Sequence, residues 1–155
     1  MNVDELLLKQ HKSIQLNLQI SEEEYNQIIQ GFQSESDAEK WKIYFNNDYL
    51  FFQRKKSKNL IYALESIRIG KNYFFKDLWV NADERENEHP DKIDVNYEKQ
   101  IVTYLIKSKL LKKKGAAFPY PDNLDEMDKK IYFHGVAGDE GDGLKDTDND
   151  FLDYD

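Results

Sequence analysis

The sequence predicts an α+β fold, in which an antiparallel β-meander of four to five strands carries two main helices on one face. One reason is the stretch 41–81, where segments rich in aromatic and β-branched residues alternate with short turn signals. Another is segment 13–20, where apolar and polar residues alternate with the period of a half-buried strand. The third is the helical spacing of apolar residues in 22–32 and 96–113.

The N-terminal part of the chain predicts a helix, a strand and a second helix. Residues 4–11 contain three consecutive leucines and favour a short helix. The alternating strand 13–20 follows. Ser21 and Glu24 have the spacing of a capping box, in which each side chain bonds to the backbone N–H of the other residue. The helix 22–32 should therefore begin directly after Ser21.

Four consecutive strands are predicted in the meander. They span residues 41–45, 49–55, 59–69 and 73–81. Asn46, Asn47 and Asp48 separate the first two, and Asn and Asp tolerate the left-handed backbone of tight hairpin turns. Gly70 opens the turn between the last two. Because strands joined by such short turns pair antiparallel, the four should form one sheet.

The C-terminal half of the domain predicts a long helix and one more strand. The apolar stripe of the helix 96–113 includes one charged residue, Lys109. The helix ends in a cluster of lysines, which complement the carbonyl end of its dipole, and Gly115 should supply a left-handed cap. After an extended loop, residues 129–136 are predicted as an additional strand.

The negative charge of the chain is concentrated at its C-terminal end. The formal net charge is -8, and residues 138–155 hold eight acidic residues and one lysine. That segment therefore carries -7 and leaves only -1 for residues 1–137. It lacks apolar periodicity, and a segment of this composition buries too little apolar surface to fold. We expect one α+β domain over residues 1–137, followed by a disordered acidic tail over residues 138–155.

Composition and missing motifs exclude several classes of protein. The chain has no cysteine, which excludes disulfides and thiolate metal sites. Its first residues do not have the pattern of a signal peptide, and no run approaches the ~18 apolar residues of a membrane helix. We expect a soluble cytoplasmic protein that does not contact a membrane. Metal-ligand histidine spacing, nucleophile motifs and phosphate-binding glycine loops are absent, so no catalytic residue, metal or cofactor is predicted.

Aromatic strand residues recur in a specific order in the centre of the chain. They are Trp41, Ile43, Tyr44, Leu50, Phe52, Arg54, Ile61 and Tyr62. Over residues 40–112 the chain resembles an uncharacterised group of small bacterial proteins with the pattern Trp-x-Ile-Tyr, then Leu-x-Phe-His-Arg-Ser-Trp-Thr-Gly, then Ile-Tyr. In the turn of that pattern only the arginine is kept, as Arg54, while Gln53 stands in place of the histidine. The resemblance implies the fold, and at this turn it implies anion binding rather than a step that needs histidine.

A cluster of positive charge lies between the second and third strands of the meander. We name residues 54–58, Arg-Lys-Lys-Ser-Lys, the basic turn. Arginine offers phosphate a planar pair of donors and lysine a point charge, so the turn is suited to bind an anion. The alternative is a solvated turn whose lysines keep the sheet from pairing with other chains. The candidate anion-binding residues are Arg54, Lys55, Lys56, Lys58, Arg68 and His134.

The acidic tail is a candidate partner-binding segment, because apolar and acidic residues are interleaved in it. The residues concerned are Asp146, Asp148, Asp150, Phe151, Leu152, Asp153 and Tyr154. The tail could bind a basic partner protein or fold back on the basic turn of its own chain. Residues 146–150 begin like a calcium-binding EF-hand loop, but Phe151 stands where that loop needs glycine, so no metal site is predicted.

Two functions from different classes fit these features. The first is a small intracellular bacterial protein-interaction module without catalytic activity, of the inhibitor or immunity-protein type, because two exposed surfaces of opposite charge suit rapid recognition of a protein partner. The second is a small enzyme or binding domain for a nucleotide or another phosphorylated ligand, with Arg54 and Arg68 as the anion-binding groups. Nucleic acid is disfavoured as a partner, because residues 1–137 are not basic overall. The sequence does not predict an oligomeric state.

Overall fold

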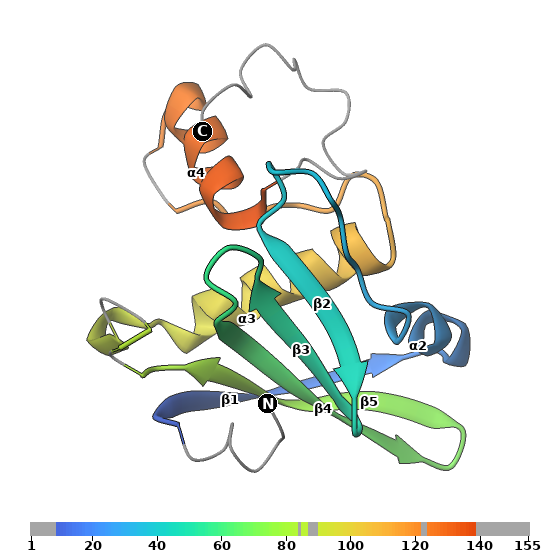
Figure 1. The fold of residues 1–155 in the computed structure, drawn as a ribbon. Helices are drawn as coiled ribbons and strands as arrows, with labels where there is room; N and C mark the ends of the chain where they lie inside the picture. Colours follow the sequence, from blue (N-terminus) through green and yellow to red (C-terminus); the bar gives the residue numbers. More distant parts are fainter. Residues whose placement is uncertain (1–8, 84, 87–89, 122–123, 139–155) are drawn as a thin grey trace.

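The protein is described by a computed structural model that covers residues 9–83, 85–86, 90–121 and 124–138. Its centre is a five-stranded antiparallel sheet with the strand order β1-β5-β4-β3-β2, and helices pack against it (Figure 1). The elements are β1 (His11–Ile20), α2 (Glu22–Ile28), β2 (Trp41–Asn46), β3 (Tyr49–Arg54), β4 (Leu60–Ile69), β5 (Asn72–Asn81), η1 (Pro90–Lys92), α3 (Val95–Leu105), η2 (Ile106–Leu110) and α4 (Glu126–Ala137). The predicted α+β class is confirmed.

The meander β2–β5 folds as predicted. Asn47 and Asp48 both have positive φ, 51° and 66°, as a type I′ hairpin turn between β2 and β3 requires. The first predicted strand, β1, then pairs with β5 at the other edge of the meander, from His11 opposite Asn81 to Ile20 opposite Tyr73. The fifth strand of the sheet therefore comes from the N-terminal part of the chain. Of the predicted helix 4–11, residues 4–8 lie outside the described part of the chain, and β1 has already begun at His11.

Helix α2 begins as predicted but ends earlier. Ser21 Oγ accepts from the Glu24 N–H at 3.1 Å, and Glu24 Oε1 accepts from the Ser21 N–H at 3.1 Å, so the capping box is formed. Gly31 then turns the chain with φ +74°, and a Cβ on it would lie 2.4 Å from the carbonyl oxygen of Ile43. The helix stops at Ile28 because the chain must reach β2, with which Phe32 forms a bridge at Ile43.

The long helix predicted over 96–113 is shorter and changes its geometry. The described helix α3 is capped by Asp94 and ends at Leu105. It continues into η2, a π-helical turn in which the Leu111 N–H donates to the Ile106 carbonyl, five residues back. Lys112 takes φ +54° directly afterwards. The prediction of a regular helix up to residue 113 with Gly115 as its cap was therefore wrong, since the helical segment ends before the last lysines.

The strand predicted over 129–136 was also wrong, because these residues belong to α4. Asp125 caps this helix by accepting from the Asp128 N–H at 2.8 Å. Phe133 and Ala137, four residues apart, are buried on the same side of it. A short apolar run of this kind has no clear period, so its sequence does not distinguish a helix from a strand. In the folded chain, the burial of Phe133 and Ala137 on one side favours the helix.

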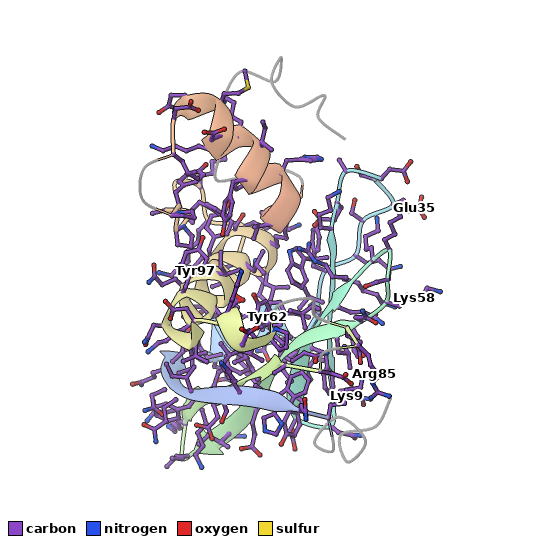
Figure 2. The ribbon with its side chains drawn as sticks, turned by 90° about the vertical axis from the view of Figure 1, so that its left-hand side faces the viewer. Lys9, Glu35, Lys58, Tyr62, Arg85 and Tyr97 are labelled. Atoms are coloured by element: carbon purple, nitrogen blue, oxygen red, sulfur yellow. The ribbon has the colours of Figure 1, made fainter. Side chains whose placement is uncertain are left out.

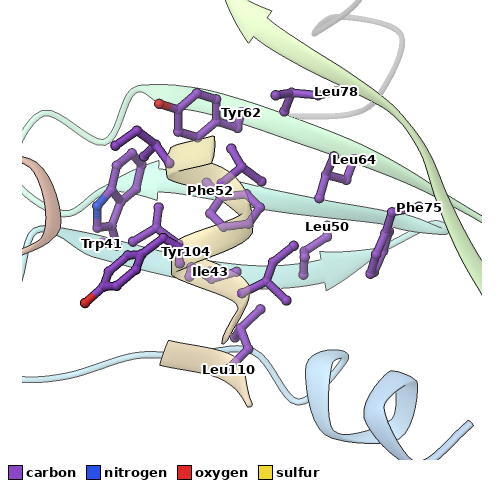
Figure 3. Packing of buried hydrophobic residues seen from close by; sticks show 14 of the residues in the cluster. Trp41, Ile43, Leu50, Phe52, Tyr62, Leu64, Phe75, Leu78, Tyr104 and Leu110 are labelled. Carbon is purple, nitrogen blue, oxygen red and sulfur yellow. The ribbon is translucent and has the colours of Figure 1, made fainter. Parts of the chain in front are cut away.

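Most of the core lies between one face of the sheet and the helical segment α3–η2. Figure 3 shows side chains of all four meander strands meeting those of Tyr104 and Leu110 from α3 and η2. Leu50, Phe52 and Leu64 are completely buried there. Each such side chain contributes ~1.5–3 kcal/mol of burial free energy. A smaller cluster on the opposite face consists of Phe51, Leu60, Ala63 and Trp79. Helix α4 lies beyond the end of the sheet that carries the β3–β4 turn (Figure 1).

Candidate functional site

The basic turn connects β3 to β4 in a fixed conformation. The Arg54 N–H donates to the Asn59 carbonyl and the Lys58 N–H donates to the Arg54 carbonyl, both at 2.9 Å. Lys58 has φ +65°, and its own carbonyl accepts from Gln53 Nε2 at 2.8 Å. The charges of this turn are therefore presented from a backbone held by both neighbouring strands.

Arg54 connects the turn to the C-terminal end of α4. Its guanidinium lies over the ring of Trp41 at 4.4 Å and donates to the carbonyls of Val136 at 3.2 Å and Gly135 at 3.3 Å. The Trp41 indole Nε1–H donates to the same Val136 carbonyl at 2.7 Å. Burial lowers the pKa of Arg54. The guanidinium N–H groups that donate to these two carbonyls are therefore not available to bind a phosphate. Instead, Arg54 stabilises the packing of α4 against the sheet.

Lys55 is also bound within the protein. Its Nζ donates to the carbonyls of Ser34 at 2.6 Å and Ser36 at 2.7 Å, in the connection that precedes β2. Its backbone N–H donates to the Lys40 carbonyl at 3.0 Å. Lys55 therefore fixes this connection to the turn.

Lys56, Ser57 and Lys58 form the exposed tip of the turn. Lys58 lies on the outer side of the sheet strands, away from α3 (Figure 2). The basic turn thus has two parts: an inner pair, Arg54 and Lys55, that stabilises the fold, and an outer pair of lysines that faces solvent.

A groove of about 940 Å³ runs between the basic turn, the connection before β2 and the end of α4. Its lining residues are Asp37, Glu39, Lys40, Arg54, Lys55, Lys56, Ser57 and Gly135. The carboxylate of Glu39 is paired with Lys109, whose Nζ lies 2.7 Å from Glu39 Oε2. Four basic side chains therefore face this groove against one unpaired carboxylate among the lining residues, that of Asp37.

The structure does not bring Arg68 and His134 to the same site as the turn. Arg68 lies eight residues along β4 from Leu60, which at ~3.3 Å per residue is roughly 26 Å from the basic turn. There its Nε donates to the Gly70 carbonyl at 2.9 Å, and its guanidinium lies 5.4 Å from the Tyr73 ring centre. His134 is on α4 near the groove, but only 5% of it is exposed. The residues predicted for one anion site thus lie in three different surroundings.

Two polar contacts in the interior were not predicted from the sequence. Tyr62 donates to Glu98 at 2.7 Å beneath α3, and burial is the main cause of the raised pKa of both groups. Beside them, the Tyr97 hydroxyl donates to the Pro119 carbonyl at 2.5 Å and bonds to the Tyr132 hydroxyl at 2.6 Å. Tyr62 lies on the side of the sheet that α3 covers (Figure 2), whereas the Tyr97 hydroxyl is directed to the segment before α4 and to α4 itself. No sequence pattern indicated these contacts. The charged residue inside the apolar stripe, Lys109, belongs to a different buried contact, the ion pair with Glu39.

Other candidate residues lie where the structure gives no test. The predicted partner-binding residues 146–154 are outside the described part of the chain. Within residues 9–83, 85–86, 90–121 and 124–138, no three histidine, aspartate or glutamate side chains are grouped so as to hold a metal ion. Over the same residues, no helix has the length and apolar character needed to cross a membrane.

No protein-family model, curated protein or solved structure matches this chain. The resemblance of residues 40–112 to a group of small bacterial proteins remains a prediction, and any functional argument depends on the geometry described above.

Proposed function

We propose that this protein is a small intracellular bacterial interaction module of the inhibitor or immunity-protein type, which binds a protein partner and does not catalyse a reaction. The main supporting observation is the arrangement of the charged residues. The anion site predicted from the sequence needs Arg54, Arg68 and His134 to converge, but they lie apart. Lys56 and Lys58 remain exposed on a rigid turn, as in surfaces that attract an oppositely charged protein.

The proposal places the recognition surface at the tip of the basic turn. Charges exposed at the rim of an interface increase the association rate, and this increase depends strongly on the salt concentration. Packing at the centre of the interface supplies most of the affinity. The expected partner is therefore an acidic protein, and its association rate should fall as the ionic strength rises.

The test is affinity capture from the organism that encodes the protein, with the full chain as bait. The variant carries Lys56→Glu and Lys58→Glu. The matched control carries Lys71→Glu and Lys76→Glu, two exposed lysines of which the first lies in the β4–β5 turn and the second in β5. A defined protein captured by the wild type and the control, but lost with the variant, would support the proposal, provided that the purified pair binds directly.

Two results would contradict it. The first is that no captured protein depends on the basic turn. The second is that a nucleotide or another phosphorylated compound copurifies with the wild type and is lost with the variant, which would favour the small-ligand function instead.

A further inference from the structure

The groove beside the basic turn lies where α4 ends. Gly138 is the last described residue, and its N–H donates to the His134 carbonyl at 3.0 Å. Its φ is +83°, and a Cβ on it would lie 2.6 Å from the Lys40 nitrogen and 2.8 Å from the Ala38 oxygen. The chain therefore leaves α4 in contact with the connection that forms one wall of the groove.

The charges of the groove and of the chain that follows Gly138 are opposite. The groove is lined by four basic residues, Lys40, Arg54, Lys55 and Lys56, and by one unpaired carboxylate, that of Asp37. The carboxylate of Glu39, also in the lining, is paired with Lys109. Residues 139–155 contain eight acidic residues and one lysine. Within a Debye length of about 8 Å at physiological salt, such charges attract each other.

The acidic chain is also long enough to reach the groove. Thr147 is nine residues beyond Gly138, and an extended chain covers at most ~3.6 Å per residue, so it can reach about 30 Å. A short flexible tether gives an effective concentration of about 1 mM, so an interaction with a dissociation constant of about 1 mM would fill the groove in about half of the molecules.

We propose that residues 146–154 of the acidic tail bind in this groove in the free protein and act as an intramolecular competitor of the partner. The occupant is an acidic segment with interleaved apolar side chains, and the same chemistry is expected of the partner segment that displaces it. The binding of the tail to the groove does not depend on whether the protein has a partner. The competition between the tail and a partner protein rests on the proposed function.

The absence of cysteine from the chain permits a direct test on the full-length protein. Thr147→Cys introduces a single attachment point for a nitroxide spin label without changing the charge of the tail. If the tail occupies the groove, the amide NMR signals of Lys56, Ser57 and Gly135 should be broadened. The signals of Gly70 and Lys71, at the opposite end of β4, should not be.

Proximity through the tether alone also broadens signals near Gly138, so a matched control is needed. The control carries the same label together with Asp146→Asn, Asp148→Asn, Asp150→Asn and Asp153→Asn, which keeps the tether and removes four charges. For a tail that binds with a dissociation constant of about 1 mM, we expect the paramagnetic broadening at Lys56 and Ser57 to fall about twofold or more in the control, because the loss of four charges weakens the attraction to the groove. It should also fall in 1 M salt, where the Debye length is about 3 Å.

A second variant tests the groove itself. Lys40→Gln with Lys56→Gln should reduce the broadening at Ser57 and Gly135 as much as neutralising the tail does, while Lys71→Gln should not change it. Equal broadening in the charged and neutral tails, or no effect of the groove substitutions, would overturn the proposal. Because no partner is present in these measurements, their failure would contradict the docking of the tail and leave the capture experiment to decide the proposed function.

Discussion

Lys109 is held inside the protein by an ion pair with Glu39. The two side chains are 2% and 0% exposed, and Lys109 also lies over the ring of Phe32 at 5.2 Å. Glu39 accepts in addition from the backbone N–H groups of Lys40 and Trp41. A buried ion pair requires such extra hydrogen bonds to offset the cost of removing both charges from water. The pair therefore fixes the connection before β2 against η2.

Breaking this pair from one side should be more harmful than replacing both partners. Glu39→Gln keeps an acceptor for the two N–H groups but leaves the Lys109 ammonium without its carboxylate, so we expect a loss of about 3–5 kcal/mol. Adding Lys109→Met to that variant should recover part of the loss. Urea unfolding of the two single variants and the double variant measures the coupling. Strictly additive losses would show that the two charges do not stabilise each other.

Glu98 should make the stability of the protein depend on pH. Burial is the largest cause of its raised pKa, and the hydrogen bond from Tyr62 and the charge of Arg54 act in the opposite direction. Because the pKa in the folded state is higher than in the unfolded state, this group contributes its full stabilising effect below the unfolded value. That contribution is lost as the pH rises from about 4.5 through the folded pKa.

Glu98→Gln should remove this dependence and still accept the hydrogen bond from Tyr62. The stability of the variant relative to the wild type should therefore increase as the pH rises above about 4.5, and then level off. Urea unfolding at a series of pH values is the measurement, with Glu35→Gln, an exposed carboxylate, as the control. A constant difference between variant and wild type across this range would be inconsistent with a raised pKa of Glu98.

At the scale of elements, glycine is required for different reasons in the turn after α2 and in the turn between β4 and β5. Gly31 and Gly70 both have positive φ, +74° and +62°. A Cβ on Gly31 would meet the Ile43 carbonyl oxygen at 2.4 Å, whereas a Cβ on Gly70 would have nothing within 4 Å. Gly31 is therefore needed both for backbone conformation and for the close approach between the end of α2 and β2.

Alanine at these two positions should separate the two effects. Gly70→Ala should cost about 1–2 kcal/mol, the usual cost of a left-handed backbone for an L-residue. Gly31→Ala adds an overpacking cost of about 1–3 kcal/mol and should be clearly more destabilising. Thermal or urea unfolding of both variants gives the comparison. Similar losses would mean that the chain around Ile43 moves easily.

For the molecule as a whole, the uneven distribution of charge predicts a folded domain that does not depend on the acidic tail. A chain that ends at Gly138 should have the free energy of unfolding of the full chain to within about 0.5 kcal/mol. Its urea slope should also be the same, because that slope follows the surface exposed on unfolding. A smaller slope in the shortened chain would show that the tail buries substantial surface and would overturn the predicted domain boundary at residue 137.

Local sequence signals predicted most elements because each depends on neighbouring residues. Ser21 and Glu24 form their capping box within four residues, and Asn47 and Asp48 adopt the turn that their residue types favour. The prediction failed at residues 129–136, where a run of apolar residues without a clear period becomes a helix. It also failed at Gly115, because the helix ends before the last lysines.

Short-range periodicity and composition were enough to predict the α+β class and the order of the meander strands. They also show that most of the net negative charge lies in residues 138–155. The contacts that the charged residues form became apparent only in the folded chain. Lys109 pairs with Glu39, which is 70 residues away in the sequence. Arg54 donates to the Val136 carbonyl at the end of α4, 82 residues away. No local pattern encodes such pairings. An unpaired charge is costly in the protein interior, so each buried charge must have a partner. Which partner is within reach depends on the packing of elements that are distant in the sequence.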